Sequence, residues 1–173
     1  MTRNEFYFSS ADETTRVYAV EWLPKGEPKA VLHIFHGDAE QMLRYEELAE
    51  YFTGQGFVVV GNEHFTKKTK NFGQEEMHTC LKITKQKYPD IPYLLLGLST
   101  GASMVNSFVK SHPEVVEGVV LADIGQEVQP IDKKLPVLHV SGIEKNCQEV
   151  FRFIYRWTEE RLDEMLYRAA TKQ

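Results

Sequence analysis

The sequence is poor in several features that would each indicate a class of protein. It has two cysteines, Cys80 and Cys147, which lie far apart and form no CxxC pair, so we expect free thiols in a reducing compartment. Its apolar runs are all well short of the roughly 20 residues that a membrane-spanning helix needs. The N-terminal MTRNEFYF also lacks the hydrophobic region of a signal peptide. These absences predict a cytoplasmic protein without a transmembrane segment.

An excess of positive charge is absent as well. The formal net charge is -5, and no basic stripe could displace the counterions of a nucleic acid, so we expect no nucleic-acid partner. The six histidines show neither HxxxH nor HExxH spacing, which predicts no metal and no other cofactor. The rest of the composition is ordinary for a globular protein, with 42% hydrophobic and 26% charged residues. We expect a single domain over residues 1–173.

The most informative stretch is YLLLGLSTGA, residues 93–102. A short apolar run ends there in Gly97-Leu98-Ser99-Thr100-Gly101, and a helical pattern begins at once. This is the G-x-S-x-G nucleophile elbow in the strand-turn-helix context that the motif requires. Glycines two positions before and after the serine remove side chains that would collide where the chain folds back. The pattern predicts a strained turn that exposes the Ser99 hydroxyl beside the amino end of a helix. The alternative is an ordinary serine in a glycine-rich turn.

Apolar strands and helical patterns alternate along the chain. We expect strands at residues 5–9, 16–22, 30–35, 57–60, 93–98, 118–122 and 136–140, and helices at residues 44–55, 75–88, 100–111 and 149–168. This alternation predicts an α/β fold with a mostly parallel sheet, whose ligand site lies beyond the carboxyl ends of the strands. Ser99, His36-Gly37 and Glu63-His64 each follow a strand, so we expect all of them at that edge.

Three stretches carry a resemblance to a known family: HGDAEQMLRYEELAEYFTGQGFVVVGNEH (residues 36–64), KYPDIPYLLLGLSTGAS (87–103) and HPEVVEGVVLAD (112–123). In these the chain resembles the α/β-hydrolases of the monoacylglycerol lipase and lysophospholipase group, often called serine aminopeptidase-like. The resemblance implies a three-layer sandwich and a small acyl ester or lipid as ligand. It also implies that Ser99 is the nucleophile and that the backbone amides of Thr100 and Asp38 form the oxyanion hole.

The chain departs from that group in three places. Between residues 123 and 136 the group inserts a helical cap over the acyl pocket, whereas here only GQEVQPIDKKL remains. Three residues after Gly142 the group has its catalytic aspartate, where this chain has Lys145 beside Glu144. The last strand of the group and the histidine after it are also missing, since residue 146 leads almost directly into the closing helix. The resemblance therefore implies a reduced version of the fold.

A serine hydroxyl needs a base before it attacks an ester, and that group uses a histidine oriented by a carboxylate. Without that histidine, the resemblance implies weak or no ester hydrolysis, as in a pseudoenzyme. The alternative is an active minimal carboxylic-ester hydrolase in which His64 or His36 serves as a substitute base and Glu144 or Asp123 as the acid.

Two other histidines are expected to lie too far from Ser99. His112 ends the elbow helix about 12 residues, or roughly 18 Å, away. His139 lies in a strand two positions across the sheet, roughly 10 Å to the side. Neither is a candidate base.

The loss of a last strand would leave residues 136–140 at an edge of the sheet. An unprotected apolar edge strand invites pairing with another chain. We therefore expect that either the closing helix covers this edge or two copies pair there as a homodimer.

Overall fold

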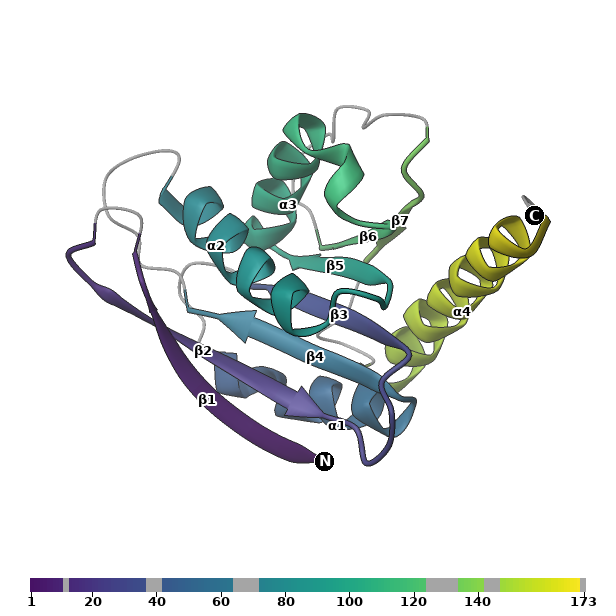
Figure 1. Ribbon diagram of the computed structural model, residues 1–173, viewed down its shortest axis with the longest axis horizontal. Helices are drawn as coiled ribbons and strands as arrows, with labels where there is room; N and C mark the ends of the chain where they lie inside the picture. The colour runs from purple at the N-terminus through teal and green to yellow at the C-terminus, as the bar shows by residue number, and fades with distance from the viewer. Residues whose placement is uncertain (11–12, 37–41, 64–71, 124–133, 142–146, 172–173) are drawn as a thin grey trace.

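One sheet organises the computed structural model, which describes residues 1–10, 13–36, 42–63, 72–123, 134–141 and 147–171. Its seven strands follow the order β1-β2-β4-β3-β5-β6-β7 (Figure 1). The strands from β4 to β7 in this order run parallel, whereas β1 and β2 are antiparallel additions at one side. The strands are β1 (Thr2–Ser9), β2 (Arg16–Leu23), β3 (Ala30–Phe35), β4 (Phe57–Asn62), β5 (Tyr93–Leu98), β6 (Gly118–Ala122) and β7 (Val137–Val140).

Helices cover both faces of this sheet. They are α1 (Glu46–Gly54), α2 (Phe72–Lys87), α3 (Thr100–Ser111) and α4 (Cys147–Thr171), with short 3-10 turns η1 (Met42–Tyr45) and η2 (Pro113–Val115). Apolar side chains of α2 and α3 pack on one face, and those of α1 and α4 pack on the other. Figure 1 shows α2 and α3 in front of the sheet and α1 behind it. The predicted α/β class and three-layer arrangement are thus confirmed.

The central strands explain why the sheet lies between two layers of helices. Every residue of β3, β4, β5 and β6 is buried, as expected for parallel strands that are covered on both faces. Each fully buried Val or Leu side chain contributes about 1.5–3 kcal/mol relative to an exposed one. Even the polar His33 in β3 is buried, and its Nδ1 lies 3.1 Å from the Tyr93 hydroxyl.

The helices begin and end close to where the sequence predicts. Helix α3 has the predicted bounds, because the elbow starts it and His112-Pro113 ends it. Helix α2 begins at Phe72 rather than Glu75, and α1 begins at Glu46 after the 3-10 turn. The sequence pattern does not predict the first residue of a helix to within one or two positions, because that residue depends on how the preceding loop enters the helix. Within the described parts of the chain, no helix is both long and apolar enough to cross a membrane.

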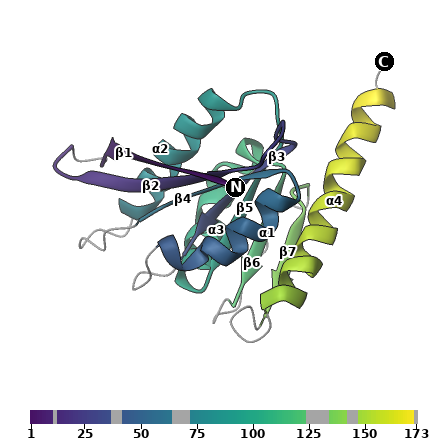
Figure 2. The same ribbon diagram turned by 90° about the horizontal axis from the view of Figure 1, so that it is seen from below.

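Strand β7 lies at the outer edge of the sheet. It pairs with β6, and no other strand of the described residues pairs with it. Helix α4 stands at this end of the sheet, and its last turns extend past it (Figure 2). Leu138 and Val140 pack into the same cluster as Phe151 and Ile154 of α4, so the helix covers a face of β7.

Candidate active site

The turn between β5 and α3 has the geometry of a nucleophile elbow. Ser99 joins the two elements with a φ of 55° and a ψ of -121°, a left-handed conformation that is strained for a residue with a side chain. Its side chain is exposed, while the residues of β5 before it are buried. The predicted strained and exposed serine is therefore present.

Both flanking glycines are required by close packing. A methyl group at Gly97 would lie 2.5 Å from the Cα of Ala102. A methyl group at Gly101 would collide with the carbonyl group of Phe35 at the end of β3 and with the oxygen of the following residue, His36, at 2.7 Å. Such distances are too short for any side-chain carbon. The close approach lets the first turn of α3 sit directly against the end of β3, which fixes where Ser99 stands.

Two backbone hydrogen bonds hold the elbow in place. The Ser99 amide donates to the Ala122 carbonyl at the end of β6, 2.9 Å away, and the Ala102 amide donates to the Ser99 carbonyl at 3.1 Å. Helix α3 starts at Thr100, so the amides of its first turn and the positive end of its dipole lie beside the serine. An anion that develops next to Ser99 would be stabilised there.

The parallel strands bring several polar residues to the same edge as Ser99. His36 follows β3, Glu63 follows β4 and Asp123 follows β6, and these strands run parallel to β5. The predicted common edge is therefore present. Asp38, His64 and Glu144 lie outside the described residues, so the second oxyanion donor, one candidate base and one candidate acid carry no structural description.

The His36 side chain is buried at this edge. Its ring stacks on Tyr45, with ring centres 6.0 Å apart. Tyr45 packs with the α1 face of the sheet, whereas Ala102 of the elbow helix packs on the opposite face. The ring and the elbow helix thus lie on different sides of the sheet, which favours a role in the end of β3 over a role as base.

Asp123 emerges beside the elbow in an uncommon conformation. Its φ is 51°, and its amide donates to the Val140 carbonyl, 2.9 Å away. The preceding residue, Ala122, accepts the hydrogen bond from Ser99. A positive φ is uncommon for residues other than glycine, although aspartate adopts it more readily than most. Of the two candidate acids, Asp123 is the one that the structure describes.

Comparison with known proteins agrees with this geometry. No family model matches the chain. A monoacylglycerol lipase of Mycolicibacterium smegmatis is 28% identical over 148 residues, which cover 79% of this chain and 51% of that protein. A carboxyl esterase from Bacillus coagulans superposes with a TM-score of 0.66 and 26% identity, over 70% of this chain and 44% of that one.

A third match extends over more of the chain. XC6422 from Xanthomonas campestris, described as an a/b serine hydrolase without lid, superposes with a TM-score of 0.66 and 12% identity, over 91% of this chain and 78% of that one.

The chain has the α/β-hydrolase fold. It resembles the monoacylglycerol lipases in sequence, as the stretches around the elbow predict. The matched part of the chain spans about half the length of that lipase. It spans 36% of a monoglyceride lipase of Mus musculus, another relative.

The other described histidines of this α/β-hydrolase fold lie away from the elbow. His112 caps the carboxyl end of α3 and stacks on Phe108, and His139 is exposed on β7, two strands from β5. Both positions agree with the sequence-based expectation. No group of three or more histidine, cysteine or acidic side chains suited to a metal ion is present within the described ranges.

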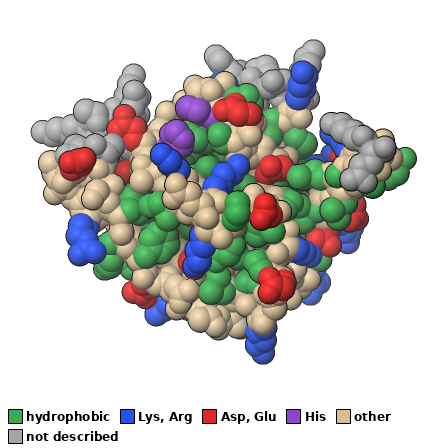
Figure 3. All heavy atoms as spheres, in the orientation of Figure 1, with side chains coloured by type: hydrophobic (Ala, Val, Ile, Leu, Met, Phe, Trp, Pro, Cys, Tyr) green, Lys and Arg blue, Asp and Glu red, His purple; other side chains and the backbone are tan. Residues whose placement is uncertain are grey.

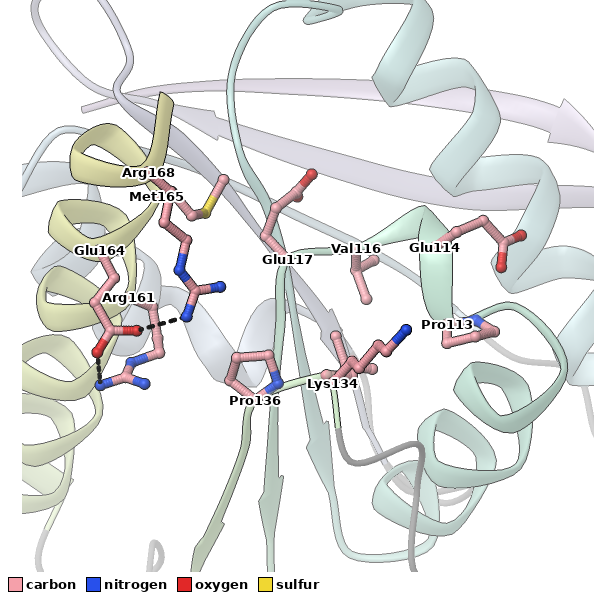
Figure 4. A pocket seen from close by; sticks show the side chains of 11 residues that line it. Pro113, Glu114, Val116, Glu117, Lys134, Pro136, Arg161, Glu164, Met165 and Arg168 are labelled. Atoms are coloured by element: carbon pink, nitrogen blue, oxygen red, sulfur yellow. Dashed lines mark ion pairs between the residues drawn. The ribbon is translucent and has the colours of Figure 1, made fainter. Parts of the chain in front are cut away.

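A cavity of about 360 Å³ lies at the amino ends of the strands, whereas Ser99 lies at their carboxyl ends. It is formed where the chain enters β6 and β7, against the last turns of α4 (Figure 4). Apolar side chains of Val116, Leu135 and Met165 line it, and Glu164 forms ion pairs with Arg161 and Arg168 at its side. The cavity is thus separate from the elbow and gives no acyl site to it.

Proposed function

We propose that this chain is a serine-hydrolase-like protein for carboxylic esters of the acylglycerol type, with Ser99 as the acyl-accepting residue and slow turnover. The observation that carries the proposal is the exposed serine, held at a φ of 55° between two glycines that nothing larger can replace. A strained conformation of this kind persists where function requires it. The named relatives, a monoacylglycerol lipase and a carboxyl esterase, support an ester as the substrate class.

The chemistry follows from this arrangement. The Ser99 oxygen attacks the ester carbonyl and loses its proton to water, and the carbonyl oxygen becomes an oxyanion. The Thr100 amide at the start of α3, together with the Asp38 amide, would donate hydrogen bonds to that oxyanion. Each such donor lowers the barrier by roughly 3 kcal/mol, because the charge it binds exists only in the transition state. The alcohol then leaves, and water releases the acid.

Slow turnover is proposed because the described residues supply no base to the serine. Among the described residues no histidine hydrogen-bonds to the Ser99 hydroxyl, which also makes no capping bond to its own helix. An unactivated hydroxyl is a poor nucleophile at neutral pH. The oxyanion donors alone still leave a rate above that in water, since residual catalysis survives loss of the base in serine hydrolases.

A second candidate is an active minimal ester hydrolase with His64 as the base. The observation that favours it is Asp123, a carboxylate directly after β6 whose backbone is held in a left-handed conformation next to the elbow. A carboxylate there would orient an imidazole of the loop after β4 only where that loop extends past the ends of β3 and β5, because these two strands lie between β4 and β6. In the sequence His64 comes two residues after the last residue of β4, and Glu144 is the alternative acid.

The two candidates differ in rate, which a paired assay measures. Purified protein is incubated with a fluorophosphonate probe and, separately, with 4-nitrophenyl acetate and a monoacylglycerol. We expect slow labelling and slow hydrolysis that Ser99→Ala abolishes and that Ser107→Ala, an exposed serine of the same helix, leaves unchanged. Fast turnover that His64→Ala or Asp123→Asn lowers by about 100-fold or more would establish the second candidate instead. Hydrolysis unaffected by Ser99→Ala would reject both.

The partner proposed for this protein, besides an acyl ester, is a second copy. The structure leaves the outer side of β7, within predicted segment 136–140, without a neighbouring strand among the described residues. Such an edge invites pairing with an identical edge.

A further inference from the structure

Two histidines from different helices meet on the surface, away from Ser99. His78 lies on α2, His112 caps the end of α3, and their ring centres are 5.3 Å apart with an angle of 44° between the planes. His78 is exposed and His112 is partly exposed. Figure 3 shows two histidine side chains side by side on the surface of this face. The pair is therefore open to ions from solvent.

The separation of the rings matches that of two ligands on one metal ion. Zinc binds an imidazole nitrogen at about 2.0–2.1 Å, and the ring centre lies about 1 Å beyond that nitrogen. A tetrahedral angle at the metal then places two ring centres about 5 Å apart. The observed 5.3 Å agrees with this value, so the backbone of the two helices already holds the rings at the distance that shared coordination needs.

His112 is also oriented as metal-binding histidines are. Its Nδ1 lies 3.3 Å from the Phe108 carbonyl oxygen, which can only accept a hydrogen bond, so Nδ1 carries the proton. The other nitrogen, Nε2, then keeps its lone pair for a ligand. The ring stacks on the Phe108 ring at 4.8 Å and 19°, which fixes its plane. Metal-binding histidines typically donate their second N–H to such an acceptor.

We propose that His78 and His112 together bind one divalent transition-metal ion, with water completing its coordination. Imidazole suits Zn²⁺, Ni²⁺ and Cu²⁺. Glu75, one helical turn before His78, adds negative charge to the same side of α2, and Lys82, one turn after it, opposes that effect. The described residues supply no third histidine, cysteine or acidic ligand here, so the site is open and weaker than a four-ligand structural site. A bound ion links α2 to α3, the helix that begins directly after Ser99.

Titration of the tag-free full chain with NiCl₂, ZnCl₂ and CuCl₂ by calorimetry tests the site. We expect one ion per chain, with Cu²⁺ bound more tightly than Ni²⁺, as the order of metal affinities requires. Loss of an outer-shell partner costs about 10-fold to 100-fold in metal affinity, so His78→Gln should cost at least as much. His139→Gln changes an exposed histidine elsewhere and should change nothing.

A second variant guards against a change in fold. His112→Phe keeps a ring on Phe108 but removes the metal ligand, so it should fold and lose affinity as His78→Gln does. Each metal should also raise the melting temperature of the unmodified chain and not that of either variant. The proposal is overturned if a variant that carries both His78→Gln and His112→Phe still binds one ion with unchanged affinity, or if no metal binds the unmodified chain at millimolar concentration.

Discussion

Gly97 and Gly101 constrain the elbow as strongly as Ser99 does, because each is in contact with backbone that no flexible side chain could vacate. Gly101 lies against the carbonyl groups of Phe35 and His36 at the end of the neighbouring strand. The serine tolerates its left-handed φ of 55° because these contacts and two hydrogen bonds determine the path of the chain around it. The reactive residue is thus positioned by residues that carry no chemistry.

Replacing Gly101 by alanine separates two opposing effects. Alanine favours a helix over glycine by about 1 kcal/mol, whereas the added methyl group collides with β3, and overpacking costs about 1–3 kcal/mol or more. We expect the collision to dominate, so Gly101→Ala lowers the free energy of unfolding and abolishes Ser99-dependent labelling. Urea denaturation measures the first effect. Gly54→Ala, at the end of α1, meets no atom within 4 Å and should be neutral or stabilising; equal losses in both variants would contradict this account.

The buried thiol of Cys80 makes the stability of the fold depend on pH in the alkaline range. Desolvation raises the pKa of its thiol to about 12, and burial also raises the pKa of Tyr93 well above its usual value. A raised pKa in the folded state stabilises the fold fully below the unfolded pKa of about 8.5, and this stabilisation is lost as pH rises toward 12. Between pH 8 and 11 the loss from Cys80 alone is about 3 kcal/mol at most.

Urea denaturation at pH 8 and pH 11 should therefore show a smaller loss of stability in Cys80→Ala than in the unmodified chain. Tyr93→Phe should also reduce the loss of stability between pH 8 and pH 11. Its whole effect should arise near pH 11, because a free tyrosine ionises near pH 10. Parallel losses in all three proteins would show that neither buried group controls alkaline unfolding.

At the scale of helices and strands, the sequence predicts the parts whose signals are local. Residues 100–111 form the predicted helix because the glycine elbow and Pro113 limit it at both ends. Residues 30–35 and 118–122 form the predicted strands because each is an apolar run of strand length. The contact of His78 with His112 could not be predicted from spacing, since it depends on how α2 packs against α3.

Lys29, just before β3, contacts residues of α4. Its Nζ lies 2.7 Å from Glu159 and 5.1 Å from the ring centres of Phe57 and Tyr155. Its side chain is partly exposed, so the ion pair contributes only about 0.2–1 kcal/mol, and the ring contacts add about 0.5–1 kcal/mol. The attachment of the helix depends mainly on the buried Phe151 and Ile154.

A double-mutant cycle of Lys29→Met and Glu159→Gln should give a coupling energy below about 1 kcal/mol that falls as salt rises. Lys29→Met alone should lower the free energy of unfolding by about 1–2 kcal/mol, because it removes the ring contacts as well. Lys25→Met changes an exposed lysine of the preceding loop and should have almost no effect. A coupling energy that salt does not change would indicate that packing, not charge, joins the two residues.

For the molecule as a whole, the direction of the strands could be predicted from the sequence, and it determines which residues lie near Ser99. The sequence predicts Ser99, His36 and Glu63 at one edge because each follows a strand, and the shared direction of β3, β4 and β5 places them there. The sequence could not predict that the His36 ring lies on the α1 side. That depends on the side-chain alternation along β3 and on its packing against Tyr45.

The free edge of β7 makes the oligomeric state a property of the whole molecule. Val119 and Asp123 of the β6 side donate to the carbonyls of Pro136 and Val140, so the alternation along a parallel strand turns the backbone groups of Val137 and His139 outward. Helix α4 packs on a face of this strand. No described strand pairs with the outward backbone groups. Two copies that align this edge would satisfy them.

Sedimentation velocity across a concentration series should therefore show a monomer–dimer equilibrium. Proline is tolerated at the first residue of an edge strand, where its missing N–H faces outward, so Val137→Pro should remove the dimer and leave the monomer folded. Hydrogen exchange supplies an independent measurement: the amides of Val137 and His139 should be protected at high concentration and exchange fast on dilution. A monomer at every concentration, with both amides always fast, would show that this edge stays unpaired and that the short length of β7 is enough to keep it so.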